Sequence, residues 1–456
     1  MRTLVRGGTV VTVDPAIGDL PQGDVLVEDG RIAAVAERID APDARVLDAT
    51  TMLVLPGFVD THRHTWQTAF RGLGADWTFG EYRAAVFGTL RPHYRPEDVY
   101  AGTLLGRLEA LHSGITTLLD WCHCADTPEH GDAALDALRE VPGRSVFGYS
   151  PAEPVAAELA RMRGRLSGDD GLVTPALGLR GPQMTSMEAT IADVAAAREL
   201  GLRASVHLHA SSPGTTQRRL VAAMRDRGLL DDRTTVIHGN GLDDDELAMM
   251  ADLGVSVSIS PDVELKMGFG WPETGRMLAA GIRPTLSIDD CLSAGGDMFS
   301  TMRTALSVQR GLDTSQGRPA TLNARDVLEF ATIDGARALG LGDRIGSITP
   351  GKQADLILLR ADDLTVFPVN HPAGAVVAAG HPGLVHTVIV AGQVVDRNGT
   401  GPDDLRARVL RSRDRIADAA GGLPPVSRAA PVARTGASPT TPPAPTAGNR
   451  STRPAG

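Results

Sequence analysis

The sequence predicts an α/β protein that combines a TIM-like (β/α)8 barrel with a small β-sandwich domain built from both ends of the chain. The first observation is a repeated order of amphipathic helix, glycine and short apolar strand between residues 56 and 346. The second is the strand-rich texture of residues 1–55, which returns in residues 347–400. Helices that alternate with near-continuous apolar strands indicate βαβ units and a buried parallel sheet. About 290 residues of such units fit a closed barrel better than a doubly wound sheet, which stays the alternative.

The two ends of the chain contain short apolar or alternating stretches that are broken by Gly and Asp. Near the start these are TLVRGGTVVTV and DVLVEDGRIAAVA, and near the end they are ADLILLR and HTVIVAGQVVDR. Such stretches between turn residues are typical of β-strands and hairpins. We therefore expect residues 1–55 and 347–400 to pair into one discontinuous β domain, with residues 56–346 inserted between them as the barrel.

Glycines divide the middle of the chain into its repeating units. Each of Gly114, Gly201, Gly254 and Gly281 ends an amphipathic segment and precedes a short apolar one, as in LEALHS-Gly114-ITTLLD. Glycine closes helices because it adopts the left-handed conformation without a Cβ penalty. Past the second β segment, residues 401–420 read as one polar amphipathic helix. Residues 421–456 are rich in Pro, Ala, Thr and Ser and predict a disordered tail.

Composition excludes several classes of protein. The formal net charge of −10 argues against general binding to nucleic acid or to an anionic membrane. Three cysteines in 456 residues cannot form a disulfide framework. No apolar run approaches the ~18 residues of a membrane helix, and the N-terminus lacks a secretory pattern. We expect a cytoplasmic protein with a small-molecule substrate and neither nucleic acid nor membrane as a partner.

Residues suited to metal binding and acid–base chemistry follow the apolar strands of the middle region. They are His62 and His64 after LVLPGFVDT, His207 and His209 in SVHLH, His238 in TTVIH, and Asp289 in LSID. The carboxyl ends of barrel strands share one face, which is where barrel enzymes place their catalytic groups. The sequence therefore predicts that these side chains converge.

Histidines two residues apart on an extended chain point to the same side, so each pair can offer two imidazoles to one ion. Imidazoles together with one carboxylate suit Zn²⁺ or Fe²⁺ at ~2.0–2.1 Å and leave a position open for water. A cation of this kind can lower the pKa of its water toward ~7. The pattern predicts a metal-dependent hydrolase.

Several stretches together resemble the amidohydrolase superfamily, in its branch of cytosine deaminases, adenosylhomocysteine deaminases and triazine chlorohydrolases. They are PGFVDTHRH from Pro56, HLH from His207, IHGN from Ile237, SPDVELKMG from Ser260, SIDD from Ser287 and GSITPGKQADLILL from Gly346. The resemblance spans most of residues 1–400. It implies a barrel hydrolase that acts on a C–N bond and that forms a homo-oligomer.

The resemblance also implies roles for individual residues. One divalent metal would be bound by His62, His64, His209 and Asp289, with His209 favoured over His207 because the family uses the second histidine of that pair. Asp289 would also act as the catalytic base that accepts the proton of the attacking water, and His238 would be catalytic and contact the substrate.

Lysine usage bears on the number of metal ions. Members of the superfamily with two metals often bridge them with a carboxylated lysine, yet Lys266 and Lys352 are the two lysines of this sequence. None precedes residue 266. We therefore expect one Zn²⁺ per chain, with Fe²⁺ as the alternative.

Ser212 departs from the pattern of the deaminases in this branch. Those resemble HxHxxE, where the glutamate passes a proton to the leaving nitrogen, and Ser212 stands at that place. A serine cannot deliver a proton with a matched pKa. Either another acid replaces it, with Asp262, Glu264 and Asp290 as candidates, or the leaving group needs less protonation.

Other residues are expected to line the substrate pocket. Glu264 replaces the amide of a Ser-Asn-Leu-Lys pattern and would face the substrate or pair with Lys266. Arg180 would bind a substrate carboxylate or carbonyl, or pair with an acid at the rim. Trp66 and Gln67 would line the pocket mouth or pack within their loop.

The function expected from the sequence is hydrolytic deamination of an aminopurine, aminopyrimidine or triazine-like heterocycle. Dechlorination, dealkylamination or opening of a cyclic amide by a hydrolase of the same superfamily is one alternative. A ligand-binding protein that has kept the fold and lost turnover is another. Cys122, His123 and Cys124 are interpreted as pocket wall or core, because a fourth ligand for a separate metal site is missing.

Overall fold

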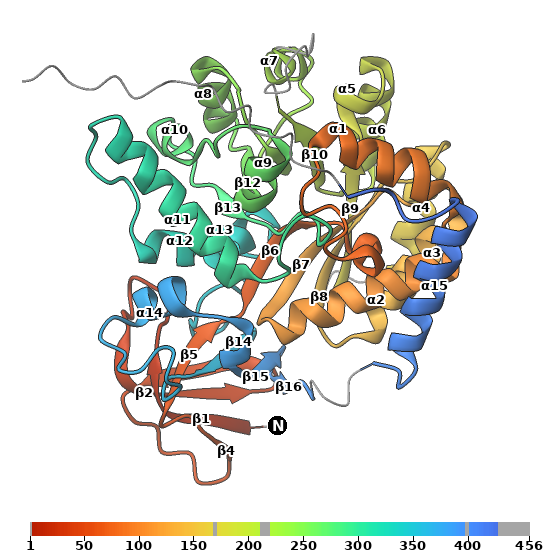
Figure 1. Ribbon diagram of the computed structural model, residues 1–456. Helices are drawn as coiled ribbons and strands as arrows, with labels where there is room; N and C mark the ends of the chain where they lie inside the picture. Colours follow the sequence, from red (N-terminus) through yellow and green to blue (C-terminus); the bar gives the residue numbers. More distant parts are fainter. Residues whose placement is uncertain (1, 167–170, 210–218, 397–400, 427–456) are drawn as a thin grey trace, which may run out of the picture.

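The computed structural model describes residues 2–166, 171–209, 219–396 and 401–426. Figure 1 shows a barrel of strands surrounded by helices, with a separate sheet at one end of the barrel. The sheet contains segments from both ends of the sequence colour scale, red and blue, whereas the barrel contains the colours between them.

Eight parallel strands form the barrel sheet and follow one another around it in chain order. They are β6 (Phe58–Arg63), β7 (Ile115–Cys122), β8 (Arg144–Tyr149), β9 (Val173–Leu179), β10 (Ala204–Leu208), β11 (Thr234–His238), β12 (Ser256–Ile259) and β13 (Thr285–Leu286). Strands β6, β7, β8 and β11 are buried along their whole length, as parallel strands covered by helices should be. This order confirms the predicted barrel and excludes the doubly wound sheet, in which the strand order reverses.

The barrel closes where the end of β6 meets the chain that follows β13. Arg63 and Asp289 form a parallel bridge. The backbone N–H of His64 donates to the carbonyl of Asp289 (2.7 Å), and the N–H of Asp289 donates to the carbonyl of His62 (2.9 Å). Closure of the barrel therefore brings His62, His64 and Asp289 together through the main chain.

Helices alternate with the strands. Around the barrel they are α2 (Pro96–His112), α3 (Pro128–Glu140), α4 (Val155–Arg165), α5 (Gly181–Met184), α6 (Met187–Glu199), α7 (Leu220–Arg225), α8 (Asp244–Asp252), α9 (Pro261–Met267), α10 (Thr274–Ala279), α11 (Met298–Ser315), α12 (Ala324–Phe330) and α13 (Ile333–Ala338). The predicted closing glycines Gly114, Gly201, Gly254 and Gly281 have φ of 86°, 68°, 68° and 87°. Their left-handed conformation explains why glycine ends these helices.

A long excursion separates β6 from α2. It contains η1 (Thr65–Phe70), α1 (Phe79–Tyr82), η2 (Arg83–Leu90) and η3 (Arg91–His93). In Figure 1, α1 lies at the top of the barrel in this view, at the end opposite the separate sheet. The excursion therefore lies at the carboxyl ends of the barrel strands.

The terminal segments pair as predicted, in a sheet of order β16-β15-β14-β5-β1-β2-β3, with β4 paired to β1. Its strands are β1 (Arg2–Val10), β2 (Leu20–Glu28), β3 (Arg31–Ala36), β4 (Arg45–Asp48), β5 (Met52–Pro56), β14 (Leu356–Arg360), β15 (Val385–Val390) and β16 (Gln393–Val394). The antiparallel β5–β14 pair joins the two segments. Strand β1 pairs with β4 through its first half and with β5 through its last residues, so the predicted sandwich is a single branched sheet.

The C-terminal segment returns to the barrel. Helices α14 (Pro372–Ala379) and η4 (Pro382–Leu384) connect β14 to β15, and α15 (Leu405–Ala419) packs against α2. Arg415 of α15 binds the carboxylate of Asp98 and donates to the carbonyl of His93 (2.9 Å). Most of the predicted tail, from residue 427 onward, lies outside the described residues. Within the described part of the chain, no helix has the length and apolar character that a membrane crossing needs.

Candidate metal centre and active site

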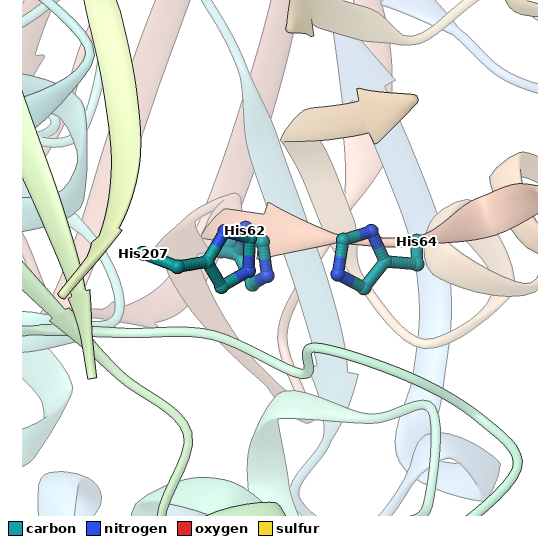
Figure 2. Close-up of side chains that lie close together, drawn as sticks. All are labelled: His62, His64 and His207. Carbon is teal, nitrogen blue, oxygen red and sulfur yellow. The ribbon is translucent and has the colours of Figure 1, made fainter. Parts of the chain in front are cut away.

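Three buried imidazoles meet at the carboxyl ends of β6 and β10. Ring nitrogens of His62, His64 and His207 all lie within 4.8 Å of one another. The ring of His62 lies 4.6 Å from that of His64 and 4.7 Å from that of His207, measured between centroids. Figure 2 shows the three rings turned toward one another. The spacing is close enough for one ion to contact all three.

Asp289 adds a carboxylate to these imidazoles. Its Oδ1 lies 3.2 Å from Nε2 of His62 and 3.4 Å from Nε2 of His64. Burial alone raises the pKa of Asp289, but the adjacent imidazoles of His62, His238 and His64 hold this pKa below its usual range. Asp289 is therefore an anionic oxygen donor beside a group of nitrogen donors.

The backbone is strained at two of these strand ends. His238 has φ of 72° and Asp289 has φ of 64°, in the left-handed region of backbone conformation that few residues other than glycine adopt. Such conformations persist where the surrounding structure enforces them, and they cluster at functional sites. Both residues line the same cavity, and their side chains approach to 3.8 Å between Nε2 of His238 and Oδ2 of Asp289.

The protonation and hydrogen bonding of the imidazoles fit a divalent cation. Nδ1 of His64 contacts the carbonyl of Trp121 at 2.7 Å, which leaves Nε2 free to bind a metal. Among the described residues, Nδ1 of His62 and Nδ1 of His207 have no hydrogen-bond partner, and Nε2 of His62 has the Asp289 carboxylate 3.2 Å away. Burial lowers the pKa of His64 to about 3 and that of His207 well below its usual value. Neutral buried imidazoles with unpaired nitrogens beside a carboxylate are the donors that Zn²⁺ prefers.

His209, which the resemblance implies as the third imidazole, lies outside this group. Its ring stacks on Phe269 at 4.7 Å between centroids and lies 5.9 Å from the ring of His238. Two residues along a strand span about 6.6 Å, and β10 ends at Leu208, so His209 lies higher toward the mouth than His207. The structure brings His207 to the other two imidazoles, while a ligand role for His209 stays a prediction.

His238 contacts a second carboxylate on the side away from Asp289. Nδ1 of His238 lies 3.2 Å from Oε1 of Glu264, which has 0% exposure. Burial alone would lower the pKa of His238, but the hydrogen bond to Glu264 and the charges of Asp289 and Glu264 raise it. Lys266, the predicted partner of Glu264, donates instead to the carbonyl of Ser293 (2.9 Å). Glu264 lies behind His238 and is not among the residues that line the cavity.

A cavity of about 730 Å³ opens over these residues. Four aromatic side chains form part of its walls, those of Phe79, Tyr82, Phe87 and Phe269. Three of the four come from the excursion between β6 and α2, which sequence reasoning did not single out. The signal was available, because the chain has only nine Phe and four Tyr, and the stretch between β6 and α2 holds three of the Phe and two of the Tyr.

Arginines and one alternative acid also line the cavity. Arg83, Arg91 and Arg180 do so, and Nη2 of Arg180 lies 3.2 Å from Oε1 of Glu153. Arg180 therefore pairs with an acid, one of its two predicted roles, and its binding of a substrate group stays a prediction. Asp290 is buried and lines the cavity, and burial together with the charge of Asp289 raises its pKa to about 7.

Four further residues were predicted to line the cavity or to supply an acid near it, and none of those that the structure describes is a lining residue. Trp66 is buried and donates from Nε1 to Nδ1 of His123 (3.2 Å), and Gln67 donates to the hydroxyl of Tyr82 (2.7 Å). Both contact residues of the cavity wall without lining it themselves. Asp262 accepts a hydrogen bond from Thr304 (3.0 Å) and is not a lining residue. Ser212 lies outside the described residues.

Comparison with known proteins places this architecture in a family. The amidohydrolase family model matches residues 53–395. This chain belongs to the amidohydrolase family. It is 34% identical over 435 residues to a 5-methylthioadenosine/S-adenosylhomocysteine deaminase of Desulforudis audaxviator, covering 91% of this chain and 98% of that protein. It is 31% identical to a 5'-deoxyadenosine deaminase of Methanothermobacter thermautotrophicus, covering 84% and 91%.

Solved structures agree with this assignment. A zinc-bound adenosine deaminase from Xanthomonas campestris superposes with a TM-score of 0.80 at 27% identity, covering 91% of this chain and 98% of that one. An atrazine chlorohydrolase from Arthrobacter aurescens, complexed with zinc, has a TM-score of 0.79 at 23% identity over 91% and 100% of the two chains, a likeness of fold. This amidohydrolase is thus an enzyme that uses a divalent metal to hydrolyse a C–N bond of a nitrogen heterocycle, which confirms the expectation from sequence.

Proposed function

We propose that this amidohydrolase removes the exocyclic amino group of an adenine nucleoside that is modified at its 5' position. The observation that carries the proposal is the buried set of His62, His64, His207 and Asp289 beneath a cavity with aromatic walls. Aromatic side chains favour offset or edge contacts with planar rings, which suits a purine base. The named activities of the relatives support an adenine ring over a pyrimidine or a triazine. In the reaction, the oxygen of water replaces nitrogen at the purine carbon, and ammonia leaves.

The metal would be one Zn²⁺ per chain, with Fe²⁺ as the alternative. His62, His64 and Asp289 would hold it together with one histidine from β10 or its end, and the spacing of the rings supports His207 over His209. The lack of any lysine before residue 266 supports a single ion without a carboxylated lysine bridge. When bound, such a cation activates water by acting as a Lewis acid.

The chain's own residues would handle orientation and protons. Asp289, which the surrounding imidazoles keep ionised, would accept the proton of the attacking water. Nε2 of His238 faces the same space as Asp289 and would contact the substrate where negative charge develops. Of the acids proposed to replace the glutamate, Asp290 lines the cavity, which supports it as the group that would pass a proton to the leaving nitrogen. Arg180 would contact polar groups of the sugar or its 5' substituent.

The proposal is tested by metal analysis together with an ammonia-release assay. Protein purified without chelators should contain one zinc or iron per chain. It should release ammonia from adenosine, 5'-methylthioadenosine, S-adenosylhomocysteine or 5'-deoxyadenosine faster than from cytosine. A chlorinated triazine in the same panel tests the dechlorination alternative by chloride release. Metal-replete protein that releases ammonia from none of these compounds would refute the proposed deamination.

A further inference from the structure

A buried carboxylate lies behind His238 and does not line the cavity, so it cannot take the roles that the sequence suggested for it. Glu264 lies in α9, the helix that follows β12, and has 0% exposure. Its Oε1 lies 3.2 Å from Nδ1 of His238, on the far side of the ring from Asp289. We propose that Glu264 is a positioning residue that fixes the proton of His238 on Nδ1 and so directs Nε2 into the cavity. The inference rests on the proposed contact between His238 and the substrate.

Two contacts of the Glu264 carboxylate come from hydrogen-bond donors. The backbone N–H of Ser260 donates to Oε1 (2.7 Å), and the side-chain amide of Asn240 lies 3.4 Å from Oε2. Oε1 accepts from Ser260, and it accepts from the imidazole as well when Nδ1 of His238 carries the proton. The hydrogen bond at one ring nitrogen decides the state of the other. With its proton on Nδ1, the neutral ring has no proton on Nε2. Nε2 is the nitrogen that faces Asp289 and the cavity, in the neutral ring and in the charged ring alike.

The contacts also hold the ring in place. Asn240, two residues after His238, donates to the carbonyl of Trp271 (3.0 Å) as well as approaching Glu264. The hydroxyls of Ser260 and Ser287 lie 2.8 Å apart, which ties the start of α9 to the chain leading to Asp289. The Glu264 carboxylate thus connects the ends of β11 and β12, and the hydroxyl of Ser260 extends this connection to the chain after β13. This connection can explain how His238 keeps its strained backbone conformation and its orientation toward Asp289.

The charge of Glu264 points to the same role. Among the ion pairs of the described residues, His238 is the partner of Glu264, and the nearby Lys266 is used elsewhere. Burying a charged carboxylate costs free energy unless hydrogen-bond donors compensate the charge. The amide that the sequence resemblance expects at this position would provide one acceptor and one donor group. A carboxylate provides acceptors alone, and therefore enforces the Nδ1-protonated ring.

The kinetic test compares E264Q and E264L with the wild type, and adds H238N and the double variant E264L/H238N. We expect E264L to lower kcat by about 10²- to 10⁴-fold, the range for loss of acid–base or tautomer control, at unchanged metal content. E264Q should recover part of this loss because its carbonyl oxygen can still accept from Nδ1. In the H238N background E264L should cause no further loss, since its effect passes through His238. An equal loss in both backgrounds would overturn the inference.

A matched control separates this effect from general destabilisation. Glu246 of α8 has 1% exposure, and its carboxylate accepts from the backbone N–H of Ala222 (3.3 Å), away from the residues that line the cavity. E246Q should leave kcat within about 2-fold of the wild type. If E246Q lowers kcat as much as E264Q does, the loss of kcat results from replacing any buried carboxylate, and the positioning role of Glu264 is wrong.

A spectroscopic test is independent of turnover. In protein labelled with ¹⁵N at its histidine rings, the signals of His238 are those that disappear in H238N. The wild type should show a protonated Nδ1 and an unprotonated Nε2 for the neutral ring, and E264L should lose this preference. If the wild type releases no ammonia but shows this tautomer, the proposed function fails and the positioning role holds. A neutral His238 protonated on Nε2 in the wild type would overturn the inference even if the enzyme is an active deaminase.

Discussion

Replacing His207 with Ala is expected to weaken metal binding far more than replacing His209 with Ala. His207 belongs to the group of three imidazoles within 4.8 Å of one another, whereas the ring of His209 stacks on Phe269 at 4.7 Å. Structural zinc sites with four ligands bind with apparent free energies of about 10–16 kcal/mol, so one ligand contributes roughly 2.5–4 kcal/mol. Loss of His207 should therefore raise the Kd for Zn²⁺ by roughly 10²- to 10³-fold.

The assay is competition for Zn²⁺ with a chromophoric chelator, combined with elemental analysis of each variant as purified. H209A should keep the metal affinity of the wild type and raise KM for the nucleoside, because its ring contacts the aromatic wall of the cavity. Circular dichroism of both variants controls for folding. If H209A loses the metal and H207A retains it, the metal set is the one implied by the sequence resemblance, and the argument from ring spacing is refuted.

Three further predictions follow from single contacts. Asp289→Asn should lower kcat by at least about 10³-fold, because it removes both an anionic metal ligand and the proton acceptor, and turnover close to that of the wild type would contradict this role. Phe269→Ala should raise KM for adenine nucleosides by about 10-fold or more, since stacking on an aromatic ring contributes about 1–3 kcal/mol per base, whereas an unchanged KM would place the base elsewhere. Arg144→Met should lower the free energy of unfolding by about 3–5 kcal/mol in urea titration, because it leaves Asp355 buried without its partner (3.0 Å), and a matched Arg408→Met at an exposed pair should cost less than about 1 kcal/mol.

The barrel could be predicted because its signals are local. The glycines at the helix ends, such as Gly114 and Gly201, and the apolar runs that follow them need no knowledge of distant residues. The positions of His62 and His238 at strand ends were equally readable. Because parallel strands in a barrel share one carboxyl end, these local facts were enough to predict that the side chains meet.

The aromatic walls of the cavity were not predicted, although their residues are visible in the sequence. Phe79 and Tyr82 belong to a four-residue helix inside an irregular excursion, which has no periodicity to interpret. Their place above the metal centre depends on how this excursion folds back over the barrel. Glu264 shows the same limit, because its contact with His238 joins two different strand ends.

The order of residues along this chain was sufficient for the architecture, the family and the convergence of His62, His64 and Asp289, since each depends on patterns within short segments and on one rule of barrel geometry. Folding in three dimensions decided which imidazole of the pair in β10 and its end joins the other two. Strand stagger moves a side chain by about 3.3 Å per residue, and only the packed barrel determines that stagger. It also decided that a carboxylate expected beside the substrate lies behind a histidine instead, because loops from separate strands meet there only once the barrel has closed.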